Sequence, residues 1–303
     1  MKKVFLCEYI HPEAYIYLKK YTEVIRDWNR ISEAEGLINR NLQITDKVME
    51  EAKALKVIAV HGTGLDGVDM KAAEVRGIEV FSTPHMNSRS VAEMNVALML
   101  AVGRKLIRAD HMIRKDMGDF AQLQGTEFYG KTLGLIGVGA ISTQTADICR
   151  AGFDMKVIGW SRHLTAVEAA RLHIRLQPSI EEVFEKSDVI VVGLSLTEET
   201  KGLIGQKHFS VMKPGGFLIN TSRGGVLDEK ALYEALKTGQ MAGAACDVFT
   251  EEPVTSKNPL LTLDNFVAAP HLGANTEEAL RRVGMAAVDG LLKRLNIEME
   301  LNK

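Results

Sequence analysis

The stretch Leu133-Gly134-Leu135-Ile136-Gly137-Val138-Gly139-Ala140-Ile141-Ser142 decides the fold. It passes from an apolar strand through two glycines into the start of a helix. Gly137 permits a tight turn, and Gly139 lets backbone N–H groups approach a pyrophosphate on the positive end of the helix. Ser142 stands at the third position of the G-x-G-x-x-G pattern and is small enough for close helix–strand packing. The alternative is a purely structural turn, but a second strand follows at the right distance and favours a dinucleotide site.

The rest of the chain alternates short β-branched runs with helical segments. The stretches 231–238 and 141–151 are long enough for crossover helices, and the N-terminal residues 1–8 read as a first strand rather than a signal segment. Nearly continuous apolar strands of this kind suit parallel sheets covered on both faces, which predicts a doubly wound α/β fold. The predicted strands include Val57–Val60, Leu133–Ile136, Val157–Trp160, Val189–Val192, Phe217–Asn220 and Phe266–Ala268.

Composition excludes several classes of protein. Of 303 residues, 46% are hydrophobic and 25% charged, with a net charge of −2, so no global field attracts nucleic acid or an anionic membrane. The longest apolar run, Val96 to Val102, is far shorter than the roughly 20 residues that span a bilayer. The three cysteines lack metal-site or redox spacing, which favours reduced thiols and a cytoplasmic location. We expect no metal site.

A long helical stretch from about Ser90 to Met117 has an apolar first half and a basic second half. A stiff helix that crosses between two domains has this pattern. The basic half could also indicate nucleic-acid binding, but no interleaved aromatic residues accompany it, so a solvated helix face is the better interpretation.

The end of the second strand of the dinucleotide unit indicates the cofactor. An Asp or Glu there binds the ribose 2′-OH of NAD, whereas this chain has Ser161 and then Arg162. An Arg pairs with a 2′-phosphate, which a carboxylate repels. We therefore predict NADP(H) in preference to NAD(H). The alternative is an NAD enzyme in which Arg162 is a surface residue and other groups contact the ribose.

Three late segments each follow a predicted strand with an ionisable residue. They contain Arg223 in S-R-G-G, the acids of D-V-F-T-E-E-P at 247–253, and His271 in P-H-L-G-A-N-T. Ligands of open α/β sheets bind at the carboxyl ends of strands, so an anion anchor, a carboxylate and an imidazole are expected on one nucleotide-binding sheet.

These motifs, with H-G-T-G-L-D-G-V-D at 61–69 and N-S-R-S-V-A-E at 87–93, resemble the D-isomer-specific 2-hydroxyacid dehydrogenases over essentially the whole chain. Within the family the chain looks most similar to the phosphoglycerate dehydrogenase branch without its C-terminal regulatory domain. The resemblance implies that Arg223, Glu252 and His271 are catalytic. Arg223 would bind the carboxylate and polarise the carbonyl, His271 would exchange a proton with the substrate oxygen, and Glu252 would orient the imidazole.

The resemblance implies further site residues. Thr63 and Gly64 would bind the substrate carboxylate, Arg40 would contact an anionic substrate or else be a plain surface residue, and Asp247 would lie beside the nicotinamide. The departures Gly193-Leu194-Ser195-Leu196, for H-T-P-L, and Trp160-Ser161-Arg162, for Y-D-P, put NAD preference in doubt rather than hydride chemistry. The full predicted cofactor set is Gly137, Gly139, Ala140, Ile141, Ser161, Arg162, Leu194, Thr221, Ser222, Asp247, Gly273 and Ala274.

We accordingly expect two Rossmann-like domains with an interdomain cleft. Residues 102–274 would bind the dinucleotide. Residues 1–101 and 275–303, with a final helix from Glu277 to Leu295, would form the substrate domain. The crossing helices and the segment 119–129 are expected to form a homodimer surface.

The substrate would be a small D-2-hydroxy acid or 2-oxo acid of the phosphoglycerate, hydroxypyruvate or glyoxylate type. Two alternatives remain at this point: a nucleotide-sensing, corepressor-like binding protein on the same scaffold, and an enzyme of different cofactor chemistry such as formate oxidation. Glu252 with His271 argues against the second, because formate oxidation needs no proton transfer and formate dehydrogenases place Gln there.

Overall fold

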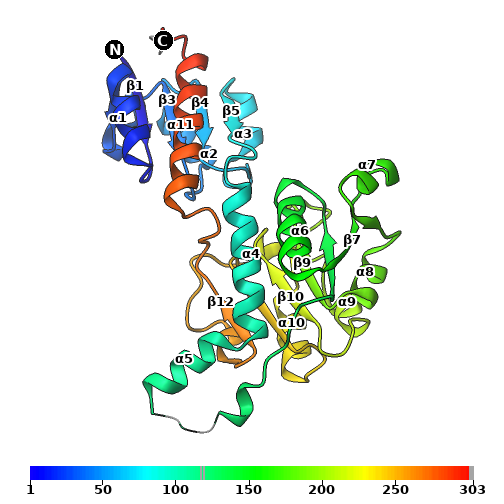
Figure 1. Ribbon diagram of the computed structural model, residues 1–303. Helices are drawn as coiled ribbons and strands as arrows, with labels where there is room; N and C mark the ends of the chain where they lie inside the picture. Colours follow the sequence, from blue (N-terminus) through cyan, green and yellow to red (C-terminus); the bar gives the residue numbers. More distant parts are fainter. Residues whose placement is uncertain (117, 119, 300–303) are drawn as a thin grey trace. The chain divides into compact units, whose positions relative to one another are not determined.

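The computed structural model describes residues 1–116, 118 and 120–299, and the chain forms two compact units. The N-terminal unit comprises 1–87 and 274–303, and the C-terminal unit comprises 88–273. Both are parallel-sheet α/β folds, as predicted (Figure 1).

The sheet of the N-terminal unit has the order β2-β1-β3-β4-β5, which is one of the two common doubly wound orders. All its strand pairs are parallel. The strands are β1 (Lys2–Leu6), β2 (Thr22–Ile25), β3 (Gly36–Asn39), β4 (Val57–Val60) and β5 (Glu79–Ser82).

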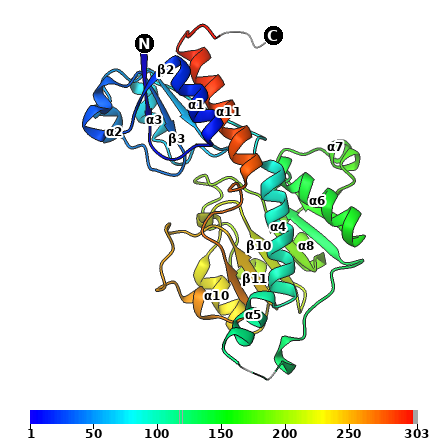
Figure 2. The same cartoon turned by 60° about the vertical axis from the view of Figure 1, so that its left-hand side comes forward.

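Helices cover both faces of this sheet, because alternate strand residues point to opposite sides. Val4 and Leu6 share a core with α1 (Pro12–Tyr21) and α11 (Glu277–Arg294), which lie side by side in both ribbon views (Figure 1 and Figure 2). Phe5 faces the other way, into a core that the other helical elements of the unit close. Those elements are η1 (Trp28–Glu33), α2 (Asp46–Glu51) and α3 (Met70–Val75).

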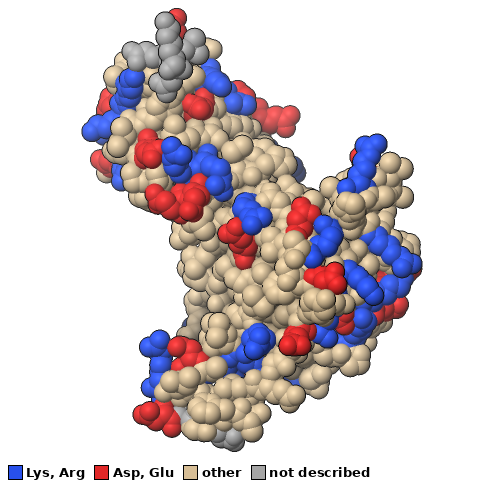
Figure 3. Space-filling view, viewed as in Figure 1, with Lys and Arg blue, Asp and Glu red and all other residues tan. Residues whose placement is uncertain are grey.

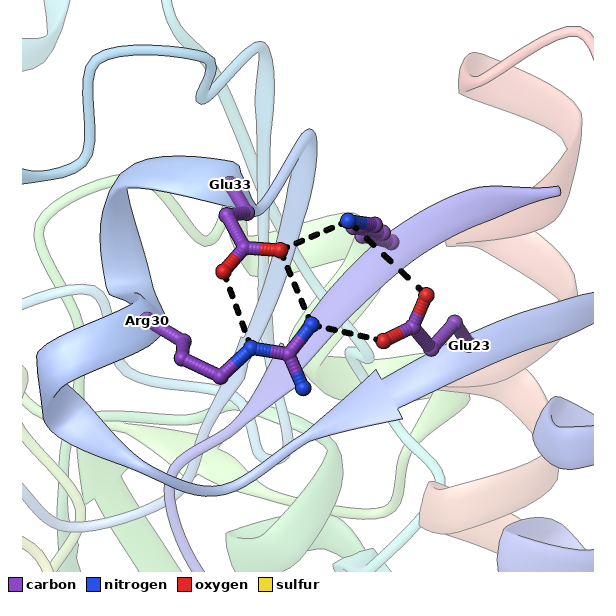
Figure 4. A network of polar contacts seen from close by, with 4 residues as sticks. Glu23, Arg30 and Glu33 are labelled. Atoms are coloured by element: carbon purple, nitrogen blue, oxygen red, sulfur yellow. Dashed lines mark hydrogen bonds and ion pairs between the residues drawn. The ribbon is translucent and has the colours of Figure 1, made fainter.

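Ion pairs fasten η1 to the edge of this sheet (Figure 4). The Arg30 guanidinium donates two bonds to Glu33 at 2.8 Å and one to Glu23 on β2, also at 2.8 Å. Lys3 on β1 donates to Glu33 at 2.6 Å. Hydrogen bonds from Arg30 and Lys3 lower the pKa of Glu33 to about 2, so the network stays ionised well into acid.

The sheet of the C-terminal unit has the order β12-β11-β10-β9-β6-β7-β8, again fully parallel. Counted from β6, this is the 3-2-1-4-5-6 order of dinucleotide-binding folds with one more strand. The strands are β6 (Thr132–Ile136), β7 (Lys156–Trp160), β8 (Arg175–Leu176), β9 (Val189–Val192), β10 (Phe217–Asn220), β11 (Gly243–Cys246) and β12 (Phe266–Ala268).

Two helix layers sandwich this sheet. Leu98 and Val102 of α4 (Ser88–Gly103) and Ala146 of α6 (Ala140–Phe153) form one core with Leu133 and Leu135. The opposite face is covered by α8 (Ile180–Lys186), α9 (Gln206–Ser210) and α10 (Glu229–Lys237). The remaining elements are α5 (Leu106–Arg114), α7 (Ala166–Arg171), η2 (Ala121–Leu123), η3 (Gly224–Val226) and η4 (Pro259–Thr262).

The structure confirms every strand that the sequence analysis named, and both crossover helices. The prediction of one continuous helix over 90–117 was wrong, because α4 ends at Gly103 and α5 starts at Leu106. A Cβ at Gly103 would lie 2.2 Å from the ring of Phe128, and Lys105 then turns the chain with a positive φ of 52°. Residue 117 of the predicted helix, and residue 119 of the predicted dimer segment, lie outside the described residues.

The first boundary between the units also differs from the expected one. It falls before α4, not at 101/102, because Leu98, Met99 and Val102 of this helix share a core with the strands of the C-terminal unit. The second boundary, at 273/274, is one residue from the expected position.

Acidic and basic side chains are intermingled on the face seen in Figure 3, in keeping with the net charge of −2. Among the described residues, no helix is long and apolar enough to cross a membrane.

Candidate active site

The glycine turn after β6 has the geometry of a phosphate cradle. Gly137 has a φ of 88°, and a Cβ there would lie 2.6 Å from the carbonyl oxygen of Gly193, so only glycine fits. Gly139 caps α6, and a Cβ there would meet no atom of the chain within 4 Å. The first N–H groups of α6, at Ala140 and Ile141, therefore begin beside open space, as a pyrophosphate requires.

Ser142 explains how the turn tolerates a departure from glycine at its third position. The side chain is buried, and its hydroxyl donates a 2.7 Å hydrogen bond back to the carbonyl of Gly137. The serine thus closes the turn from inside the helix. The residues present fit a dinucleotide.

The cradle lies where the strand order of the sheet reverses. β6 pairs with β7 on one side and with β9 on the other, and Leu194 follows β9 with a methyl 3.0 Å from where a Gly137 Cβ would stand. Ligands of doubly wound sheets bind outside the carboxyl ends of the strands at this reversal.

Arg162 follows β7, as predicted, directly after the half-buried Ser161. Its guanidinium forms an ion pair with Glu199, in the loop after β9. Glu199 was not predicted from the sequence, because it lies 37 residues from Arg162 and no sequence pattern indicates that the two side chains meet.

The loop that carries Arg223 is shaped by a buried asparagine at the end of β10. Asn220 Oδ1 accepts bonds from the amide and the hydroxyl of Ser222 at 3.0 and 2.8 Å, and its amide nitrogen donates to the carbonyl of Arg223. A Cβ at Gly224 would lie only 1.9 Å from the backbone carbon of Phe249. The S-R-G-G segment is therefore pressed against the loop that leads to Glu252.

Glu252 and His271 form a hydrogen-bonded pair. Glu252 Oε2 lies 2.8 Å from Nδ1 of His271, and Oε1 accepts the backbone N–H of Phe249 at 3.0 Å. Because an ionised carboxylate can only accept, Nδ1 carries the proton and Nε2 is left for other chemistry.

The pKa of Glu252 reports which groups surround it. Burial alone would raise this pKa, but the bonds from His271 and Phe249 and the positive charges of His271 and Arg223 outweigh burial and lower it. The charges of Arg223 and His271 thus both act on Glu252.

Asp247, at the end of β11, holds the loop of His271. Its carboxylate accepts the N–H of Leu272 and that of Gly273, both at 2.7 Å, and its backbone carbonyl accepts the N–H of His271 at 2.7 Å. Burial raises the pKa of Asp247, although these N–H bonds oppose the shift. These three hydrogen bonds keep the backbone of His271 in the left-handed region, at a φ of 56°, which few residues other than glycine adopt.

In the N-terminal unit, the predicted substrate residues follow strands β3 and β4. Glu8, after β1, fixes the Arg40 loop by accepting the amides of Arg40, Asn41 and Leu42 at 2.8, 2.7 and 3.2 Å. The Arg40 guanidinium donates to Asn275 at 3.1 Å. Glu8 was not predicted as a site residue. Its position, an acidic residue directly after the first strand, could have pointed to it.

Thr63 and Gly64 lie in the loop after β4, and the hydroxyl of Thr63 donates to Asn87 at 3.2 Å. Of the predicted cofactor residues, Ala274 belongs to the N-terminal unit and the others to the C-terminal unit. Among the described residues, no three His, Cys, Asp or Glu side chains gather as a metal site would require.

Comparisons with known proteins agree with this geometry. The D-isomer specific 2-hydroxyacid dehydrogenase NAD-binding domain matches residues 96–273. The chain is 37% identical over 311 residues to a D-3-phosphoglycerate dehydrogenase from Methanocaldococcus jannaschii, covering 100% of this chain and 59% of that protein. It is 39% identical over 270 residues to a hydroxypyruvate reductase from Thermotoga maritima, covering 88% of this chain and 87% of that protein.

A solved structure shares the architecture as well. An NADPH-dependent glyoxylate/hydroxypyruvate reductase from Sinorhizobium meliloti, in complex with NADP and malonate, superposes with a TM-score of 0.84 at 27% identity, over 96% of this chain and 92% of that chain.

Proposed function

Because the chain belongs to the D-isomer-specific 2-hydroxyacid dehydrogenase family, we propose that it transfers a hydride between a nicotinamide cofactor and C2 of a small D-2-hydroxy acid or 2-oxo acid. The observation that carries this proposal is the Glu252–His271 pair within reach of the Arg223 charge. A proton donor backed by a carboxylate, beside a guanidinium, is what reduction of a 2-oxo acid needs.

The cofactor would be held by the glycine turn at Gly137 and Gly139 and by the first amides of α6, with Leu194, Thr221 and Ser222 alongside. When bound, it supplies or accepts the hydride. We propose Arg162 as the contact to a 2′-phosphate, which would make NADP(H) the preferred form.

The chain's own groups then divide the remaining work. Arg223 binds the carboxylate of the 2-oxo acid and polarises its carbonyl, since a guanidinium can donate several N–H bonds in a fixed fork. His271 gives a proton from Nε2 to the carbonyl oxygen during reduction and takes it back during oxidation. Glu252 keeps Nδ1 protonated, and Asp247 keeps the His271 loop in place.

Arg40, Thr63 and Gly64 are proposed to bind the anionic groups of the substrate. The relatives act on phosphoglycerate and hydroxypyruvate, according to their names, and both substrate types stay open for this chain. The relatives reported are dehydrogenases and reductases, so the corepressor-like alternative is not favoured.

We also propose a homodimer and a cytoplasmic location. The apolar side chains of Leu106, Ile107 and Ile113 on α5 are more than half exposed, which suits a contact with a second copy. The cysteines are unpaired thiols, as expected in a reducing compartment.

One absorbance panel tests the activity. The protein is mixed with NADH or NADPH and with one of three acids: hydroxypyruvate, glyoxylate or phosphohydroxypyruvate. The decrease in absorbance of the reduced cofactor at 340 nm is then followed. We expect oxidation of the cofactor with at least one of these acids and its loss in His271→Gln. Absence of turnover with every pairing would contradict the proposal.

A further inference from the structure

The loops after β7 and β9 flank the glycine turn, because these two strands are the neighbours of β6 in the sheet. Arg162 comes from the first loop and Glu199 from the second, and their ion pair joins the two loops. The side chains are 45% and 72% exposed, so both remain accessible to a ligand.

The second loop is held in shape by its own hydroxyl groups. Thr200 is buried, and its hydroxyl accepts the N–H of Thr197 at 2.8 Å and donates to the carbonyl of Ser195 at 2.6 Å. The Thr197 hydroxyl in turn accepts the N–H of Thr200 at 3.3 Å. Glu199 therefore extends from a closed turn, which defines where its carboxylate can reach.

The adenosine ribose of a dinucleotide lies at the end of the second strand of such a unit, which is β7 here. A 2′-phosphate would need the Arg162 guanidinium, which already has a carboxylate partner. It would also bring about two negative charges close to Glu199. A ribose 2′-OH brings no charge, and a carboxylate can accept its hydrogen bond.

We propose that Glu199 is a specificity-determining residue that holds Arg162 and disfavours the 2′-phosphate of NADP(H) relative to NAD(H). Glu199 takes the place of the acid that the second strand lacks, from a loop that follows a different strand. Arg162 and Glu199 then pull cofactor choice in opposite directions. This inference rests on the proposed nicotinamide-dependent activity.

The test compares two neighbouring charge-removing variants. Glu199→Gln removes the partner of Arg162, and Glu198→Gln is its matched control, since the exposed Glu198 has no ion pair among the described residues. For each, kcat/KM is measured with NADPH and with NADH under one buffer and salt condition. We expect Glu199→Gln to raise the NADPH/NADH ratio about 2- to 5-fold, which is the scale of a lost exposed ion pair. Glu198→Gln should stay within about 1.5-fold.

A second arm asks whether Glu199 acts through Arg162. In an Arg162→Gln background, the ratio should fall, and adding Glu199→Gln should then change it less than it does alone. An unchanged ratio in Glu199→Gln, or an equal rise in Glu198→Gln, would overturn the proposal. An equal effect of Glu199→Gln in both backgrounds would overturn the role through Arg162.

Cofactor binding provides a readout that does not need the substrate. The dissociation constants of NADPH and NADH, from titrations of reduced-nicotinamide fluorescence, should shift in the same ratio. If turnover fails with every acid but this shift appears, the activity proposal fails and the role of Glu199 stands. If turnover is present but Glu199→Gln changes the NADPH/NADH ratio neither of kcat/KM nor of the dissociation constants, only the role of Glu199 fails.

Discussion

The hydroxyl of Thr221 donates a 2.8 Å hydrogen bond to Oδ1 of Asn95, a side chain on α4 that is only 1% exposed. The amide nitrogen of Asn95 donates to the Thr145 hydroxyl on α6 at 3.0 Å, and Thr145 donates to the carbonyl of Ile141 at 2.9 Å. One buried asparagine thus ties the loop before Arg223 to the first turn of the helix that begins the cofactor cradle.

Replacing Asn95 with Leu should destabilise the C-terminal unit by about 1–3 kcal/mol, because the buried hydroxyl of Thr145 loses a donor and the half-buried hydroxyl of Thr221 loses its acceptor. Urea unfolding followed by the fluorescence of Trp160, in a Trp28→Phe background, measures the loss. A double-mutant cycle with Thr221→Val should show a coupling of at least about 0.5 kcal/mol. Strictly additive effects would argue against the network.

Asp247→Asn should reduce kcat about 100-fold, since catalytic geometry is sensitive to shifts of about 1 Å. The substitution keeps the shape but turns one acceptor into an NH₂ donor, which then faces the N–H of Leu272 or of Gly273. Steady-state kcat with saturating cofactor is the measurement. Asp264→Asn, at a carboxylate that is 73% exposed, is the control, and a kcat of Asp247→Asn within threefold of wild type would contradict the role.

Particular residues show what a sequence reveals and what it hides. Strand runs such as Val189–Val192 and the glycine turn were predictable, because periodicity and backbone freedom are local properties. The grouping of Arg223, the acids of 247–253 and His271 followed from the rule that parallel strands end at one edge, and the choice of Glu252 among those acids came from the family resemblance. Asn95 and Glu199 were not predictable, because their partners depend on helix packing and on loop paths that no local pattern encodes. The break between α4 and α5 was missed as well, because it lies at the positive φ of Lys105, a backbone angle that hydrophobic periodicity does not mark.

Glu252→Gln should lower kcat of the reductive reaction about 10- to 100-fold throughout pH 5–8. The pKa of Glu252 lies below its usual value of 4.5, so the wild-type carboxylate is ionised over this range and can only accept the hydrogen bond with Nδ1 of His271. A glutamine can instead turn its NH₂ group toward Nδ1, and the ring is then no longer fixed with Nε2 available to the substrate. Steady-state kcat between pH 5 and 8 checks this, and a kcat of Glu252→Gln within threefold of wild type would contradict the role of Glu252.

His61 should make the N-terminal unit less stable in acid. Its side chain is 6% exposed, and burial lowers its pKa from 6.5 to about 4. Between these values the unfolded chain binds a proton that the folded chain does not. The free energy of unfolding is therefore undiminished above pH 6.5 and falls as the pH drops toward 4, by up to about 3 kcal/mol in total.

Unfolding by urea at pH 7, 6, 5 and 4.5 tests this behaviour in a Trp160→Phe background. Trp28, whose ring centroid lies 4.7 Å from that of Phe5, is then the sole tryptophan and reports the N-terminal unit. In His61→Gln the slope of unfolding free energy against pH should decrease by close to one proton, about 1.4 kcal/mol per pH unit, between pH 6 and 5. Gln43→Asn, at an exposed side chain of the same unit that carries no ionisable group, should leave the slope unchanged. An equal slope in wild type and His61→Gln would show that His61 takes up its proton in the folded state.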